Sequence, residues 1–156
     1  MPHVGSAIPF QIVALGASNT AGYGVGQDQA YPAVLETLLS ARGMNVSVQN
    51  AGISGNTTGE MLARLDQAVP SGTRVVILQP GSNDRRRGIP DAVRDGNIAT
   101  IQSILERRGI AVVRVAAAFE MARVGNLQPD GIHYTAAGHA VIASLLVDQV
   151  AALLNA

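Results

Sequence analysis

Short apolar runs alternate along the chain with segments in which apolar residues recur every three or four positions. The apolar runs predict strands at residues 10–15, 46–49, 74–79 and 110–115. The recurring pattern predicts helices at residues 31–42, 57–68, 91–108 and 135–154, the last with Thr135 as its N-cap. Mostly continuous apolar strands separated by helices indicate a parallel sheet that is covered by helices on both faces.

Length and composition place the chain among single globular domains. With 156 residues and no internal repeat or linker, the sequence predicts one domain over residues 1–156. Its 47% hydrophobic and 14% charged residues exclude intrinsic disorder. Eleven basic residues balance eleven acidic ones, which argues against nucleic acid or an anionic membrane as a partner. We therefore expect a small molecule as the partner; the oligomeric state is left open.

The sequence offers little to hold a cofactor or a metal. Without Cys, the chain has no thiolate for a zinc or iron–sulfur site and no cysteine nucleophile. Of its three His, His3 lies near the N-terminus and His139 inside a predicted helix, so we expect no catalytic zinc site. Neither GxGxxG nor GxxxxGK[ST] occurs. We expect no cofactor.

A membrane span is also not expected. No segment approaches the roughly 18 consecutive apolar residues that a span needs, and the most apolar stretch, residues 140–147, ends at Asp148. The first ten residues lack the basic and apolar regions of a signal peptide. A cytoplasmic protein and the mature form of a secreted one both fit this pattern.

Four loops rich in Gly and small polar residues follow the first three strands or precede the last helix. They span residues 16–24, 50–57, 80–84 and 130–135. Because ligands bind at the carboxyl ends of the strands in such sheets, we expect the site there. Together the loops offer a hydroxyl, backbone N–H donors, an amide and an Asp–His pair.

These groups suit acyl transfer. Ser18 on a tight turn after a strand can act as a nucleophile, and His133 can take its proton. Asp130, three residues before His133, can hold the imidazole tautomer. Gly52 and Asn83 can donate hydrogen bonds to the developing oxyanion.

Four blocks, in order, give a family resemblance. Ser18 lies in LGASNTAGYG, Gly52 in NAGISGNTT, Asn83 in GSND, and Asp130 and His133 in DGIHYT. The chain thus resembles the SGNH hydrolases, or GDSL esterases/lipases, most closely the bacterial thioesterase/lysophospholipase type. The resemblance implies a three-layer α/β/α flavodoxin-like sandwich and a Ser18–His133–Asp130 triad. It also implies an oxyanion hole made by the N–H groups of Ser18 and Gly52 and the Asn83 amide.

The chain departs from this family in two ways. Ala17 stands where the family usually has an Asp that orders the nucleophile turn. Only fourteen residues, 116–129, separate the last predicted strand from Asp130, too few for the family's extra helix and strand. We therefore expect a shortened sheet of four to five strands, with a short fifth segment near residues 116–120. The acyl-binding side should be open and lined by small residues such as Ala17, Ala51 and Ser54.

Other interpretations of these residues remain. Ser18, Asn83 and Asp130 also suit caps and turns, and Gly52 a positive φ angle. Residues 85–87, three consecutive Arg, fit a solvated basic cluster, with guidance of an acidic substrate as the alternative.

The predicted function is a serine esterase that hydrolyses short-chain acyl esters. The alternative is a weakened or inactive module that binds acylated or carbohydrate ligands.

Overall fold

The computed structural model describes residues 8–156, so the expectations for His3 and for a leader lie largely outside it. Its sheet has four parallel strands in the order β2-β1-β3-β4. The strands are β1 (Phe10–Gly16), β2 (Val46–Gly52), β3 (Thr73–Leu78) and β4 (Ala111–Arg114). The parallel sheet predicted from the apolar runs is thereby confirmed.

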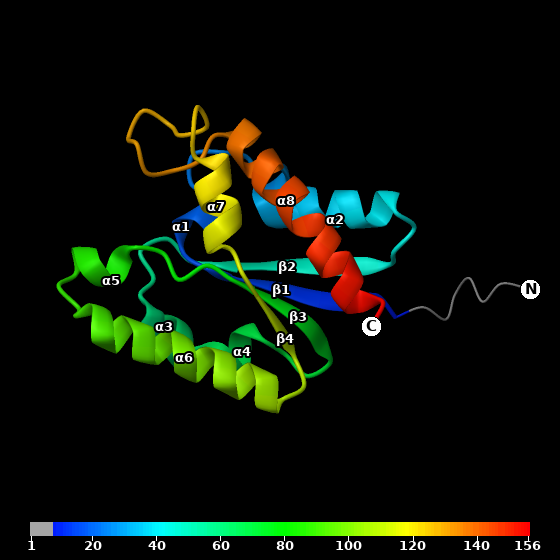
Figure 1. Ribbon diagram of the computed structural model, residues 1–156, viewed down its shortest axis with the longest axis horizontal. Helices are drawn as coiled ribbons and strands as arrows, with labels where there is room; N and C mark the ends of the chain where they lie inside the picture. The colour runs from blue at the N-terminus through cyan, green and yellow to red at the C-terminus, as the bar shows by residue number, and fades with distance from the viewer. Residues whose placement is uncertain (1–7) are drawn as a thin grey trace, which may run out of the picture.

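Helices cover both faces of this sheet (Figure 1). One layer contains α2 (Tyr31–Ala41), α7 (Ala116–Ala122) and α8 (Ala136–Leu154). The other contains α3 (Thr58–Ala63), α4 (Leu65–Ala68), α5 (Asn83–Arg86) and α6 (Asp91–Arg107). The short helix α1 (Ser18–Ala21) and the 3-10 helix η1 (Gln27–Gln29) follow β1. The predicted α/β/α sandwich is confirmed.

Strand β1 shows why these runs are apolar without interruption. Ile12 and Ala14 belong to the core under α2 and α8, whereas Val13 and Leu15 belong to the core under α3 and α6. All four side chains are fully buried. Successive residues of a strand point to opposite faces, so a strand covered on both sides must be apolar at every position.

Helix α8 is a core helix that begins at the predicted cap. The Thr135 hydroxyl accepts the N–H of Gly138 at 3.1 Å. By length and mean hydropathy it is the one helix within residues 8–156 apolar enough to cross a membrane, which differs from the expectation that no segment approaches a span. Ile142, Leu146 and Val150 are nevertheless buried in the core that α8 shares with α2. Core packing accounts for its apolar character.

Three boundaries differ from the prediction. Residues 116–120 lie in α7 and form no fifth strand, as suits the run AAAFEMA with its strong helix formers. Strand β2 extends to Gly52, because residues 50–52 pair with the end of β1. The helix predicted over 57–68 is interrupted at Arg64, whose guanidinium donates to the carbonyls of Gly16 and Ala51.

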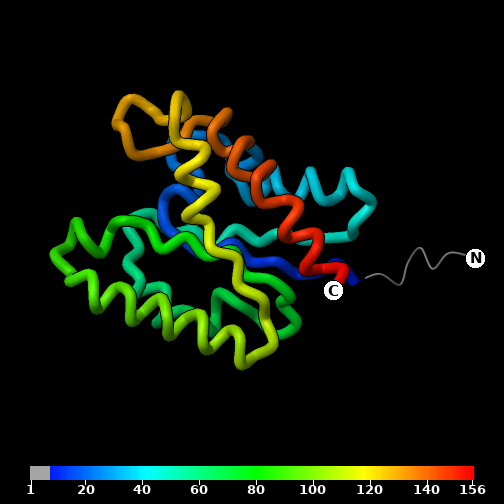
Figure 2. The backbone as a smooth tube through the Cα atoms, viewed as in Figure 1, coloured from blue at the N-terminus to red at the C-terminus, as the bar shows by residue number. Residues whose placement is uncertain are grey.

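The loops singled out in the sequence gather at one end of the molecule. Figure 2 shows the turn after β1, the segment after β3 and the loop before α8 at the end opposite the C-terminus. This is the carboxyl edge of the parallel strands, where α/β sheets bind ligands.

Candidate active site

Three side chains form a continuous chain of hydrogen bonds across two loops. Ser18 is the first residue of α1, directly after the turn that ends β1. Its Oγ lies 2.9 Å from Nε2 of His133. Nδ1 of the same ring lies 2.6 Å from Oδ2 of Asp130. The structure therefore brings Ser18 together with His133, 115 positions later in the sequence, and with Asp130.

The Asp130 carboxylate is held in a local turn. Its Oδ1 accepts the N–H groups of Ile132 at 2.9 Å and of His133 at 3.0 Å. The side-chain hydrogen bond from His133, followed by these backbone bonds, lowers the pKa of Asp130 to about 2. The ionised carboxylate favours a proton on Nδ1 of His133 and leaves Nε2 free to accept one from Ser18.

Asn19 and Gln128 join the two loops, and sequence reasoning missed both. Asn19 donates from Nδ2 to the carbonyl of Ile132 and accepts the N–H of Tyr134, each at 3.2 Å. Gln128 donates from Nε2 to the carbonyls of Tyr23 and Tyr134, each at 2.8 Å. The position of Asn19 beside Ser18 was a signal, whereas nothing in the sequence pointed to Gln128.

The ring of Tyr23 covers the His133 ring. Their centroids are 4.3 Å apart, with an interplanar angle of 33°. Tyr23 is itself 54% exposed, so its contact with the imidazole leaves an apolar ring surface in water. This contact limits the rotation of the His133 ring.

A buried hydrogen-bond network supports the turn after β1, where Ala17 replaces the Asp that is usual in the family. Oε1 of Gln79 accepts the N–H of Ala17 at 2.9 Å and the hydroxyl of Thr20 at 2.8 Å. The Thr20 Oγ1 lies 3.1 Å from the Tyr31 hydroxyl, which must donate because Thr20 already donates to Gln79. Burial raises the pKa of Tyr31 and keeps this hydroxyl protonated. Gln79 thus anchors the nucleophile turn to the end of β3.

Two predicted oxyanion donors are placed beside the nucleophile cleft. Asn83 begins α5, and its Nδ2 donates one hydrogen to the carbonyl of Asn56 at 2.9 Å. The amide is oriented by this bond and retains a second N–H. The backbone N–H of Ser18 is at the start of α1, where the first helical N–H groups have no partner within the helix.

The structure does not place Gly52 in this group, which corrects the expectation. Its N–H donates to Oδ1 of Asn50 at 2.9 Å. A Cβ at Gly52 would lie 2.3 Å from the backbone nitrogen of Ala21, so glycine is required for the close approach of α1 to β2. In the same loop Gly55 has φ +82°, and within residues 8–156 no hydrogen bond takes its N–H. Gly55 directly precedes Asn56, to which Asn83 is bonded.

Asp84 fixes α5 against α3. It is fully buried, and its carboxylate accepts the N–H of Thr58 at 2.8 Å and the Thr58 hydroxyl at 2.6 Å. Asn56 is held in turn by Nε of Arg64 at 2.8 Å. These bonds position Asp84, which directly follows Asn83, and Asn56, to which Asn83 is bonded.

Ser18 lines a cleft of about 480 Å³, here called the Ser18 cleft. Its walls come from the turn after β1, the segment after β3, α7 and the loop before α8. Ala17, Ser18, Gln79, Asn83, Phe119 and Tyr134 are among its lining residues, with Arg86, Arg94, Glu120 and Arg123 as the charged ones. Ala17 lines it as expected, but Ala51 and Ser54 do not, and α7 supplies one of the walls.

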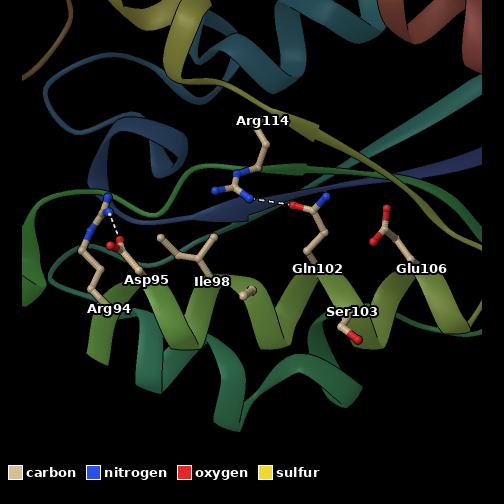
Figure 3. Close-up of a pocket in the computed structure, with 8 residues that line it drawn as sticks. Arg94, Asp95, Ile98, Gln102, Ser103, Glu106 and Arg114 are labelled. Atoms are coloured by element: carbon tan, nitrogen blue, oxygen red, sulfur yellow. Dashed lines mark hydrogen bonds and ion pairs between the residues drawn. The ribbon is translucent and has the colours of Figure 1, made fainter. Parts of the chain in front are cut away.

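A second hollow, of about 390 Å³, lies between α6 and the end of β4 (Figure 3). Its polar groups pair with one another: Arg114 donates to Gln102 at 2.6 Å, and Arg94 lies 3.6 Å from Asp95. Ser103 is present there without a His, so this hollow lacks the groups for acyl transfer. Within residues 8–156 no three His, Asp or Glu side chains are grouped as metal ligands.

Comparison with known proteins agrees with this geometry. Residues 14–113 match the GDSL-like Lipase/Acylhydrolase family. An arylesterase of Vibrio mimicus is 36% identical over 104 residues, which are 66% of this chain and 52% of that protein. The esterase TesA of Pseudomonas aeruginosa is 30% identical over 103 residues, 65% of this chain and 51% of that protein. The matched segment thus spans about half the length of these relatives.

Solved structures share the fold. The crystal structure of TesA has a TM-score of 0.82 at 23% identity, over 92% of this chain and 99% of that one. That of AlinE4, an SGNH-hydrolase family esterase, has a TM-score of 0.70 at 28% identity, over 96% of this chain and 99% of that one. The family match covers well over half of the 156 residues. The chain belongs to the GDSL-like lipase/acylhydrolase family.

Proposed function

We propose that the protein is a carboxylic ester hydrolase that cleaves short-chain acyl esters through an acyl-enzyme. The observation that carries the proposal is the chain from Ser18 Oγ to His133 at 2.9 Å and on to Asp130 at 2.6 Å. The names of two relatives, an arylesterase and an esterase, support the same chemistry.

In the first step, Oγ of Ser18 attacks the ester carbonyl carbon while its proton passes to Nε2 of His133. Asp130, whose pKa is lowered to about 2, is ionised and stabilises the imidazolium that forms. As the tetrahedral intermediate collapses, His133 gives the proton to the leaving alcohol and Ser18 keeps the acyl group.

The negative oxygen of the intermediate needs donors that are already in place. We assign this role to the backbone N–H of Ser18 and to the second N–H of the Asn83 amide. The Asn83 bond to Asn56 fixes that amide before substrate arrives. As third donor we assign the unbonded N–H of Gly55 in place of Gly52.

Water then repeats the sequence on the acyl-enzyme. His133 takes a proton from the water, the resulting hydroxide attacks the acyl carbon, and the carboxylic acid leaves as Ser18 recovers its proton. These steps need only the side chains described, so the proposed reaction uses no cofactor.

The test is hydrolysis of p-nitrophenyl acetate by the wild type and by Ser18→Ala and His133→Ala. The matched control is Ser103→Ala, which removes an exposed serine in the hollow of Figure 3. We expect both site variants to lose turnover at least 1,000-fold while the control keeps it. Wild-type turnover in either folded site variant would overturn the proposal.

A further inference from the structure

The three consecutive Arg at residues 85–87 are not equivalent. Arg85 pairs with Asp91 at 3.0 Å, and Arg87 pairs with Glu60 at 2.7 Å. Arg86, between them, lines the Ser18 cleft, and no carboxylate of the described chain lies within 4 Å of it. Two of the three cations are therefore locally neutralised, and the one that lines the Ser18 cleft is not.

A second cation without an ion pair among residues 8–156 lines the same cleft from a different element. Arg123, which follows α7, lines the same cleft and likewise has no ion pair among residues 8–156. The third, Arg94, donates to the Gly81 carbonyl and has Asp95 at 3.6 Å. Glu120 is the one carboxylate that lines the cleft.

This local balance differs from that of the whole chain. The protein has a net charge of zero, whereas three Arg face one Glu in the cleft. A cleft lined by one sign of charge concentrates ligands of the other sign. The guanidinium group is planar and binds a carboxylate through two parallel hydrogen bonds, which favours anionic oxygen groups.

We propose that the Ser18 cleft selects esters that carry a second, anionic group, a carboxylate, which Arg86 and Arg123 bind while Ser18 attacks the ester carbonyl. The inference rests on the proposed esterase function and deepens it, since it names the class of substrate. It assigns to the middle arginine of residues 85–87 the guidance of an acidic substrate.

The experiment compares pairs of esters that have the same number of carbon atoms and differ in whether they carry a carboxylate. The carboxylate is placed on the acyl side by p-nitrophenyl hydrogen adipate against p-nitrophenyl hexanoate, which have the same six-carbon acyl chain. It is placed on the alcohol side by para-acetoxybenzoate against para-acetoxybenzamide. For at least one pair we expect kcat/KM to be about 3- to 10-fold higher for the anionic member, since each exposed ion pair contributes little. The pair that shows the difference identifies which end of the ester faces the two Arg.

The variant Arg86→Gln with Arg123→Gln should bring that ratio to about 1, and so should about 0.5 M salt, which screens exposed charges. Arg85→Gln is the matched control, because Arg85 neighbours Arg86 but does not line the cleft, and its ratio should equal that of the wild type. A wild-type ratio of 1 or less in both pairs, or a ratio that the double variant retains, would overturn the anion preference while neutral ester hydrolysis still stands. Failure to hydrolyse any of the four esters would instead overturn the esterase function itself, and this inference with it.

Discussion

Gln79 and Ala17 are joined by a buried hydrogen bond of 2.9 Å, from the backbone N–H of Ala17 to the Gln79 side-chain oxygen. This bond ties the residue before Ser18, the proposed nucleophile, to the end of β3. It supports the turn at the position where the family usually carries an Asp. The nucleophile turn is thereby held by a side chain from another strand.

Gln79→Met should lower kcat about 10- to 100-fold with little change in KM. It preserves volume but leaves the Ala17 N–H and the Thr20 hydroxyl without an acceptor, which costs about 1–3 kcal/mol of stability for each buried group. Steady-state kinetics well below the melting temperature, together with thermal unfolding, measure both effects. Gln102→Met, at a half-buried amide on α6, should change neither. Wild-type kcat in folded Gln79→Met would contradict the positioning role.

Asn83→Ala should lower kcat by about 10²- to 10³-fold with a nearly constant KM, because an oxyanion donor acts in the transition state. Gln102→Ala is the control: it removes a half-buried amide on α6 that contacts Arg114 and does not line the Ser18 cleft. If Asn83→Ala raised KM alone, Asn83 would bind the substrate ground state instead.

Protein stability should fall as the pH drops from about 6.5 to about 4, because of His139. Burial lowers the pKa of His139 to about 4, and its Nε2 has no partner within residues 8–156. Between these pH values the unfolded chain binds a proton at His139 that the folded protein does not bind. The free energy of unfolding is therefore lower by about 3 kcal/mol at pH 4. Urea unfolding at a series of pH values measures it.

The control for this prediction is His139→Asn, whose amide oxygen can still accept the Tyr31 N–H that Nδ1 of His139 accepts at 3.0 Å. The variant should show a flatter acid limb because it does not titrate there. An equally steep limb would assign the acid sensitivity to other groups.

Neutral esters should be hydrolysed best from acetyl to butyryl, with kcat/KM falling beyond about six carbons. Each added CH₂ contributes about 0.8 kcal/mol only if water is excluded from it. Helix α7 lines one side of the Ser18 cleft, but the charged side chains of Arg86, Glu120 and Arg123 also line it and favour its hydration. A p-nitrophenyl ester series below the solubility limit measures this, and a rise through decanoyl would show an apolar groove.

The fold and the three hydrogen-bonded residues could be predicted because their signals are local. Apolar runs such as that of β1 report burial on both faces, and loops that follow parallel strands must meet at one edge. Asp130 and His133 lie within one turn, so their contact follows from a spacing of three residues. The place of Ser18 at this edge follows from its position directly after β1.

The other features of the site depend on contacts between residues far apart in the sequence, and the spacing of residues does not predict such contacts. Gln79 reaches Ala17 across 62 positions, and the ring of Tyr23 contacts that of His133 from another loop. The block around Gly52 predicts an oxyanion donor, whereas its lack of a side chain allows α1 to pack closely against β2. Residues 116–120 were ambiguous between strand and helix because a short apolar run suits both.

The most direct test of the central claim is the reaction of the folded protein with a fluorophosphonate, followed by intact mass and peptide mapping. We predict one adduct per chain, on Ser18, formed at least 100-fold more slowly in His133→Ala and at an unchanged rate in Ser103→Ala. A well-folded protein that took up no label, or took it up elsewhere than Ser18, would contradict the account and would favour a module that binds acylated ligands without cleaving them.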